Sequence, residues 1–312
     1  MKLLSLENYC FCIFLFFLPF TQGLTLNVGF PLKISEIFLI LVFILWLIRI
    51  IMSNIQLTVS RLQIILAVFV FLILVSTVIN IFWQYPYDLN LNASRINPAA
   101  DSFLKFGYVI LVAIAFIVTT NKTKHSAGFT KYLLYGAIVS CCYSWYLLFS
   151  TVLKLPVFLL PGMDKYPQLI ALPFGNFIRS GTFKEGNYLG FYILLSAIVA
   201  LYQNKRGLSL FFFISIITSF STIAFACGII FWIIYLLRTA KRKANLVYII
   251  IVSSIVTGIL LFVIFNQALR SVFISKIFFN EETANIAEIY STLDRLNVAE
   301  VGLRIFYNNP FW

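Results

Sequence analysis

Charged residues are scarce in this chain. Only 11% of its 312 residues are Asp, Glu, Lys or Arg, while 61% are hydrophobic and the mean hydropathy is +0.96. Water-soluble domains carry about 25% charged residues, so this composition excludes an ordinary soluble protein. A nucleic-acid-binding protein needs a solvated basic face, which the chain lacks despite its net charge of +12.

Residues that bind metals are also few. The chain has one histidine, no Asp-x-Asp pair and no cluster of His and Asp with ligand spacing. We therefore predict no metal and no cofactor. His125 stands among lysines in a predicted loop and is assigned no catalytic role. The five cysteines lie in apolar segments without metal-ligand spacing, so we interpret them as buried structural thiols.

Long apolar segments, in contrast, are abundant. Several reach the ~18–20 residues that a helix needs to cross a hydrocarbon core. The predicted fold class is therefore all-α, a polytopic integral membrane helix bundle. The first 23 residues also fit a signal peptide, but the many apolar segments behind them favour a retained first helix. Crossings are predicted near Tyr9–Gly29, Ile34–Met52, Gln63–Trp83, Phe103–Thr120, Tyr132–Leu153, Asn187–Gln203 and Leu246–Phe265.

One apolar segment, Leu208–Leu237, is too long for a single straight crossing. As one helix its 30 residues would measure about 45 Å, against a hydrocarbon core of about 30 Å. Basic clusters flank it at Lys205–Arg206 and at Arg238–Lys243. Two short crossings, broken near Ser219–Thr222, would keep both clusters on the inner side. This hairpin brings the predicted total to about nine transmembrane helices, with the N-terminus in the cytoplasm.

The distribution of charge supports this orientation. Inner segments carry both basic clusters and several further basic residues, with Glu7 as their only acid, whereas the other ten acidic residues, from Glu36 to Glu300, fall outside or at outer helix ends. The net charge of +12 is therefore mainly a signal of topology. The inner basic residues outside the two clusters are Lys2, Arg49, Arg61, Lys122, Lys124 and Lys131.

The predicted organisation has two parts. Residues 1–266 form the transmembrane bundle, with a proline-rich and irregular outer loop at 154–186. Residues 267–312 begin a large periplasmic loop, which carries an amphipathic helix from Glu281 onward. The chain stops just past that helix, so we expect it to be a fragment of a longer protein.

Arg179–Gly190, which reads RSGTFKEGNYLG, is one of the few places where charged and glycine residues interrupt the apolar sequence. This segment resembles the R-x-S-G-T-F-x-E-P-N-Y-L-A pattern of the bacterial O-antigen ligase and polymerase family, with Gly186 where proline is usual. The segment Ser219–Thr222 is similar to the family's T-x-S-R, with Thr222 in place of the arginine. The stretch from Arg295 to Trp312 resembles the arginine-led helix that runs into P-L-x-G-x-G, but the glycine pair is missing.

The resemblance implies a membrane glycosyltransferase of the bacterial inner membrane with a periplasmic active face. Such enzymes take an oligosaccharide from a polyprenyl diphosphate and join it to a hydroxyl of a glycan or of the lipid A core. Their partners would be the lipid-linked donor, the acceptor and the bilayer, with no nucleic acid. Polymerase and ligase remain open, because the histidine that distinguishes the ligase would lie beyond this terminus.

Site residues follow from that chemistry. Arg179 is predicted to contact the diphosphate, since a guanidinium stays charged and matches phosphate oxygens. Arg295 would add a second positive charge. Glu185 would act either as general base or as an ion-pair partner that orients Arg179, and the ion-pair role is favoured. Gly181 would let backbone approach the substrate closely. Asn187 and Arg304 complete the substrate-binding set, although Arg304 also stands four residues from Glu300, within helical pairing distance.

Three alternatives stay open. Arg179 is also explained as an interfacial arginine that extends its charge to the membrane surface. A polytopic transporter or flippase of lipid-linked glycans would equally use a broken span. Such proteins usually place ionisable residues near the bilayer midplane, where this sequence predicts almost none. A purely structural membrane subunit, or an inactive fragment, is the third alternative.

Overall fold

The computed structural model describes residues 2–27, 31–53, 60–82, 98–123, 127–163, 168–172 and 175–239, together with residues 300, 303 and 307. The chain is mostly helical and divides into two compact units. The first unit comprises Met1–Tyr146, Val157–Gln168 and Arg179–Ser221. The second comprises Leu147–Pro156, Leu169–Ile178 and Thr222–Trp312.

Among the described residues, four helices are long and apolar enough to cross a membrane, at Ile34–Met52, Arg61–Ile79, Ser102–Lys122 and Thr130–Val152. These four helices coincide with four of the predicted crossings, because uninterrupted apolarity over ~18–20 residues is a strong signal. The predicted crossing at Leu246–Phe265 and the amphipathic helix from Glu281 lie outside the described residues.

The helices of the first unit are α1 (Lys2–Phe17), α2 (Ile34–Ser53), α3 (Arg61–Phe82), α4 (Pro98–Thr123), most of α5 (Thr130–Val152), α6 (Gly186–Tyr202) and α7 (Arg206–Ser215), with 3-10 turns η1 (Ala127–Phe129) and η2 (Ile216–Ser219).

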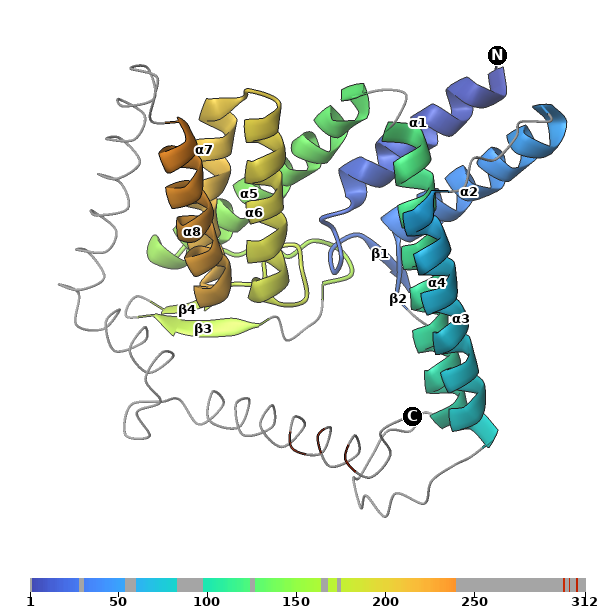
Figure 1. Ribbon diagram of the computed structural model, residues 1–312. Helices are drawn as coiled ribbons and strands as arrows, with labels where there is room; N and C mark the ends of the chain where they lie inside the picture. Colours follow the sequence, from blue (N-terminus) through green and yellow to red (C-terminus); the bar gives the residue numbers. More distant parts are fainter. Residues whose placement is uncertain are drawn as a thin grey trace. The chain divides into compact units, whose positions relative to one another are not determined.

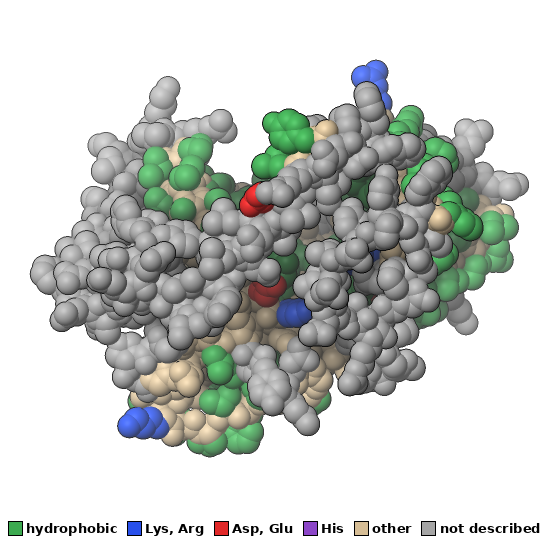
Figure 2. All heavy atoms as spheres, turned by 90° about the horizontal axis from the view of Figure 1, so that it is seen from below, with side chains coloured by type: hydrophobic (Ala, Val, Ile, Leu, Met, Phe, Trp, Pro, Cys, Tyr) green, Lys and Arg blue, Asp and Glu red, His purple; other side chains and the backbone are tan. Residues whose placement is uncertain are grey.

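Helix packing in the first unit is local. Helix α1 packs against α2, α2 and α3 pack against α4, and α6 packs against α7 (Figure 1). The core between α1, α2 and α4 is apolar and includes Phe11, Phe14, Leu39, Val42 and Val118. Apolar side chains are also common on the described surface, where few charged ones are seen (Figure 2). An apolar exterior is what a bilayer would cover.

The first predicted crossing, Tyr9–Gly29, is wrong in its second half. Helix α1 ends at Phe17, and the chain then forms β1 (Thr25–Asn27), which pairs antiparallel with β2 (Pro31–Lys33). Pro19 explains the early end, since proline disfavours helical backbone in the residue before it and cannot donate a hydrogen bond. Apolarity alone does not distinguish such a turn from a continuing helix.

The loop predicted to be irregular, 154–186, contains a second hairpin. Strand β3 (Leu169–Leu172) pairs antiparallel with β4 (Gly175–Ile178), with Leu169 opposite Ile178 and Leu172 opposite Gly175. This hairpin belongs to the second unit, together with α8 (Thr222–Thr239). Strands of four residues are too short to produce a recognisable alternation within an apolar sequence.

The long segment Leu208–Leu237 is broken where the sequence predicts. Helix α7 tightens into η2, which ends at Ser219, and α8 begins at Thr222. Phe220 between them adopts a left-handed conformation with φ of +47°, which ends the helical path. The break is therefore confirmed, whereas the placement of both basic clusters on the inner side stays a prediction.

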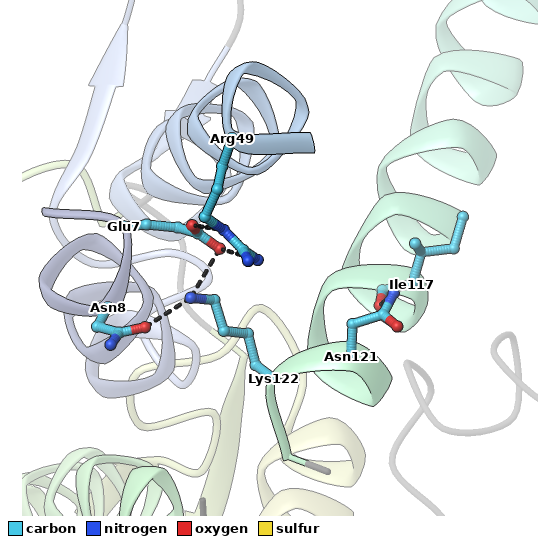
Figure 3. Close-up of polar contacts among 6 residues, drawn as sticks. All are labelled: Glu7, Asn8, Arg49, Ile117, Asn121 and Lys122. Atoms are coloured by element: carbon cyan, nitrogen blue, oxygen red, sulfur yellow. Dashed lines mark hydrogen bonds and ion pairs between the residues drawn. The ribbon is translucent and has the colours of Figure 1, made fainter. Parts of the chain in front are cut away.

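A cluster of charged side chains interrupts the core of the first unit (Figure 3). The Glu7 carboxylate lies 2.7 Å from Lys122 Nζ and 2.8 Å from Arg49 Nε. Glu7 is in the second turn of α1, Arg49 is near the end of α2 and Lys122 is in the last turn of α4. The contacts therefore bring the beginning of α1 and the ends of α2 and α4 together, as expected if all three lie on one side of the membrane.

Gly136 sets how closely α1 and α5 approach. A Cβ at this position would lie 2.2 Å from the carbonyl oxygen of Phe16, a backbone atom that cannot turn aside. We expect Gly136→Ala to lower the free energy of unfolding by roughly 1–3 kcal/mol, the usual range for overpacking. Gly107→Ala is the matched control, because a Cβ there meets nothing within 4 Å. Thermal unfolding in detergent measures both, and equal melting temperatures would contradict the close packing.

Candidate functional site: a loop at the beginning of helix α6

Residues 179–185 form the loop that leads into α6, and Gln168 accepts hydrogen bonds from both ends of this loop. The N–H of Arg179 donates to the carbonyl oxygen of Gln168 at 3.1 Å. The N–H of Gly186 donates to the side-chain Oε1 of the same glutamine at 2.9 Å. One residue therefore closes the loop, and its side chain satisfies a donor at the helix terminus that would otherwise have no intrahelical partner.

The middle of the loop is anchored through Thr182. Its buried hydroxyl shares a hydrogen bond with the hydroxyl of Ser140 in α5 at 2.7 Å. Its carbonyl oxygen accepts hydrogen bonds from the N–H groups of Thr21 at 3.2 Å and Gln22 at 3.1 Å, just beyond α1. Thr182 thus joins the loop to two other segments of the first unit, and these contacts limit its movement.

Gly181 is required by the backbone conformation and by close packing inside the protein. Its φ of +54° lies in the left-handed region, which side chains with a Cβ rarely adopt. A Cβ would also lie 2.5 Å from Ser144 Oγ and 2.9 Å from Leu189 Cδ2. The close approach is therefore to α5 and α6 of the protein itself. Contact of this glycine with a substrate stays a prediction.

The end of the loop, at Gly186, packs against Ser219 at the end of η2. Gly186 is buried, and a Cβ there would lie 2.5 Å from the carbonyl oxygen of Ser219 and 3.0 Å from that of Arg179. The structure consequently brings together parts of the first two segments that resemble the ligase and polymerase family, Arg179–Gly190 and Ser219–Thr222. Contact between them is not apparent from their separation in sequence.

Positive charge gathers at the beginning of α6. N–H groups without intrahelical partners and the helix dipole give a helix N-terminus a partial positive charge. Two basic residues belong to the same loop, Arg179, which is partly exposed, and Lys184, which is exposed. Asn187, the second residue of α6, is partly exposed as well.

Glu185 occupies the N-cap position of α6, but its side chain does not cap the helix. Its backbone is extended, with φ of −132° and ψ of 143°, and its side chain makes no capping hydrogen bond. The carboxylate is partly exposed. Its two predicted roles, as general base or as partner of Arg179, both stay predictions.

Four of the six predicted site residues therefore share one loop and helix terminus: Arg179, Gly181, Glu185 and Asn187. Arg295 and Arg304 lie outside the described residues, so a second cation at the site remains a prediction. Within the described part of the chain, no group of three or more His, Cys, Asp or Glu residues could hold a metal.

Sequence reasoning missed the residues that support the loop. Gln168 and Ser140 stand in unremarkable contexts, and no pattern marks them. In the sequence Ser180 is only one letter of the motif, but its hydroxyl is fully buried and has no hydrogen-bond partner among the described residues. A polar group buried in this way is uncommon and costs stability.

No protein-family model, no curated protein and no solved structure matches this chain. The resemblance to the O-antigen ligase and polymerase family therefore depends on the quoted residues alone.

Proposed function

We propose that this protein is a membrane glycosyltransferase that joins a polyprenyl-diphosphate-linked oligosaccharide to a glycan or to a lipid acceptor. The observation that carries the proposal is the geometry of the loop 179–186. Arg179 belongs to a loop that is held at both ends by hydrogen bonds to Gln168 and leads into the positive terminus of α6. A diphosphate presented at a membrane surface is an anion of the size and charge that such a terminus binds.

The reaction needs positive charge at the leaving group. The acceptor hydroxyl attacks the anomeric carbon, the bond between that carbon and the diphosphate oxygen breaks, and polyprenyl diphosphate departs with the bonding electrons. Arg179 would stabilise the charge that develops on the departing oxygens, and an interaction of this kind is strongest where water is excluded. Glu185 would accept the proton of the attacking hydroxyl if it is the general base. Arg295 would contribute a second cation.

The placement of the loop supports an outer active face. Thr182 is bound to residues just beyond the C-terminal end of α1, whereas Glu7 and its basic partners lie near the other end of that helix. In the proposed orientation, with a cytoplasmic N-terminus, the charged cluster faces the cytoplasm and the loop faces the periplasm of a bacterial inner membrane. A lipid-linked donor would meet Arg179 at the outer surface.

Reporter fusions test the orientation. Reporters placed after Arg206 and after Arg242 should both read as cytoplasmic, because two short crossings keep both basic clusters inside. A fusion within the loop at Lys184 should read as periplasmic. Opposite readings after Arg206 and Arg242 would show that Leu208–Leu237 connects the two sides and would reverse the second half of the topology.

The function itself is tested by donor consumption. The natural gene product, reconstituted in vesicles with a polyprenyl-diphosphate oligosaccharide and a glycan acceptor, should lengthen the acceptor and release polyprenyl diphosphate in equal amounts. Arg179→Lys should abolish most of both products.

A further inference from the structure

We propose that Glu7 is a positioning residue: its carboxylate clamps α1 onto α2 and α4, and α1 in turn holds the loop 179–186. The inference concerns the geometry of the loop, so it does not depend on the reaction that the loop performs. It joins two features on one helix, the charged cluster near its beginning and the attachment of Thr182 just beyond its end.

The clamp consists of one acid shared between two bases. The Oε2 atom of Glu7 accepts a hydrogen bond from Arg49 Nε at 2.8 Å. Its Oε1 atom accepts one from Arg49 Nη2 at 3.4 Å and lies 2.7 Å from Lys122 Nζ. Lys122 also donates to the side-chain oxygen of Asn8, one residue further along α1. Figure 3 shows the three charged side chains converging from three helices.

Burial makes the cluster a strong determinant of packing. The Glu7 side chain is 0% exposed and that of Lys122 only 7%, whereas that of Arg49 is 26% exposed. Glu7, Phe11 and Phe14 recur at helical spacing on one buried face of α1, so the carboxylate continues the stripe that forms the core. Removing one partner of a buried ion pair leaves an uncompensated charge, which is strongly destabilising. In this cluster, loss of Glu7 would leave two cations facing each other.

Helix α1 transmits this constraint to the loop. Only about 15 Å of helix separates Glu7 from Phe17, at 1.5 Å per residue. Immediately beyond it, the N–H groups of Thr21 and Gln22 donate to the carbonyl oxygen of Thr182. The close contact between Gly136 and Phe16 ties the same end of α1 to α5, whose Ser140 binds the Thr182 hydroxyl. If α1 shifts relative to α2 and α4, the hydrogen bonds that hold the carbonyl oxygen and the hydroxyl of Thr182 are both disturbed.

Opening of the loop is measured at Ser180, whose buried hydroxyl has no partner among the described residues. Ser180→Cys should therefore be tolerated, and the rate at which a small membrane-permeable thiol reagent labels it reports loop opening. Labelling is counted by mass spectrometry at that residue, so the five native cysteines do not interfere. We expect Glu7→Gln to raise the labelling rate roughly tenfold or more, because the lost ion pair destabilises the packing of α1.

Two controls make the result specific. Glu36→Gln removes a different carboxylate, which lies 2.8 Å from Lys33 Nζ. This ion pair joins residues only three apart in sequence, so its loss should leave the labelling of Ser180→Cys unchanged. Ser196→Cys probes a buried position in α6 and should label equally slowly with and without Glu7. An unchanged rate at Ser180→Cys in Glu7→Gln, or an equal increase at both probes, would overturn the proposal.

A third variant covers the case in which Glu7→Gln does not fold. Replacing the whole cluster with apolar side chains, as Glu7→Leu, Arg49→Met and Lys122→Met together, removes every buried charge and commonly restores packing. A folded triple variant in which Ser180→Cys is again protected supports the role of α1 in holding the loop. A folded triple variant with rapid labelling at that position contradicts it.

Discussion

A protein carrying Arg179→Lys should insert into the membrane normally and lose glycan transfer by about 100-fold, a loss typical of removing one group that stabilises developing charge. Lysine keeps the positive charge but loses the planar fork that binds two phosphate oxygens at once. The backbone of residue 179 would still donate its N–H to Gln168, so the loop itself should remain closed.

The measurement is acceptor elongation in vesicles, with insertion checked separately. Lys184→Ala is the matched control, because Lys184 is an exposed cation of the same loop and carries no predicted role. It should retain transfer within about twofold, since a solvent-exposed charge is screened and contributes little. Near-normal transfer by Arg179→Lys would contradict bidentate binding of the diphosphate.

Gly186→Ala should cause the second large effect, with loss of both stability and transfer. The added Cβ would lie 2.5 Å from the carbonyl oxygen of Ser219 and 3.0 Å from that of Arg179, and backbone atoms cannot rotate away. The beginning of α6 would have to move from η2, which costs roughly 1–3 kcal/mol as overpacking does. A displacement of about 1 Å at a catalytic group can itself reduce a rate by about 100-fold.

Gly207→Ala is the control for this substitution. Gly207 lies in the first turn of α7, and a Cβ there would meet nothing within 4 Å. Alanine also has the higher helix propensity, so stability should be unchanged or slightly raised. Unfolding curves and transfer assays compare the two variants. If Gly186→Ala matches Gly207→Ala in both, the junction between α6 and η2 has no role at the site.

The same contact also predicts the effect of proline at position 186. Proline is usual at the position of Gly186 in the family that the motif resembles. In this chain a proline would bring a Cβ against the Ser219 carbonyl oxygen and remove the N–H that donates to Gln168. Gly186→Pro should therefore be more damaging than Gly186→Ala here, even though proline is the residue of the pattern that this segment resembles.

Membrane spans were predictable because their signal is cumulative. The segment Ile34–Met52 needs only its apolar composition to be recognised, and its helix begins at the predicted residue. Tyr9–Gly29 failed because composition does not show where an apolar helix ends, and the single proline at position 19 outweighs the apolar residues behind it. The break near Ser219 was predicted from flanking charges rather than from any feature of the break itself.

The candidate site was predictable only where the motif is contiguous. Arg179, Gly181, Glu185 and Asn187 are neighbours in sequence, so their proximity follows directly. The supports of the loop come from distant segments, Gln168, Ser140 and the residues after α1, and single-sequence patterns carry no information about such contacts. The sequence marks Glu7 as the only acid of the predicted inner segments, but its burial between two basic residues depends on the packing of three helices.

The charged cluster also bears on the transporter alternative. Ionisable residues buried between membrane helices are typical of transport pathways. Here Glu7 lies in the second turn of α1 and Lys122 in the last turn of α4, near the ends of their helices rather than at their middle. That position favours a structural clamp over a pathway across the membrane.

The most direct test of the proposed function follows one lipid-linked donor with two readouts. The natural gene product is placed in sealed vesicles with a polyprenyl-diphosphate oligosaccharide and a glycan acceptor, and both donor consumption and donor movement between leaflets are recorded. A glycosyltransferase predicts that the acceptor is lengthened, that polyprenyl diphosphate appears in equal amount, and that both depend on Arg179. Movement of intact donor across the bilayer, with no polyprenyl diphosphate released, would contradict the transferase and identify a flippase.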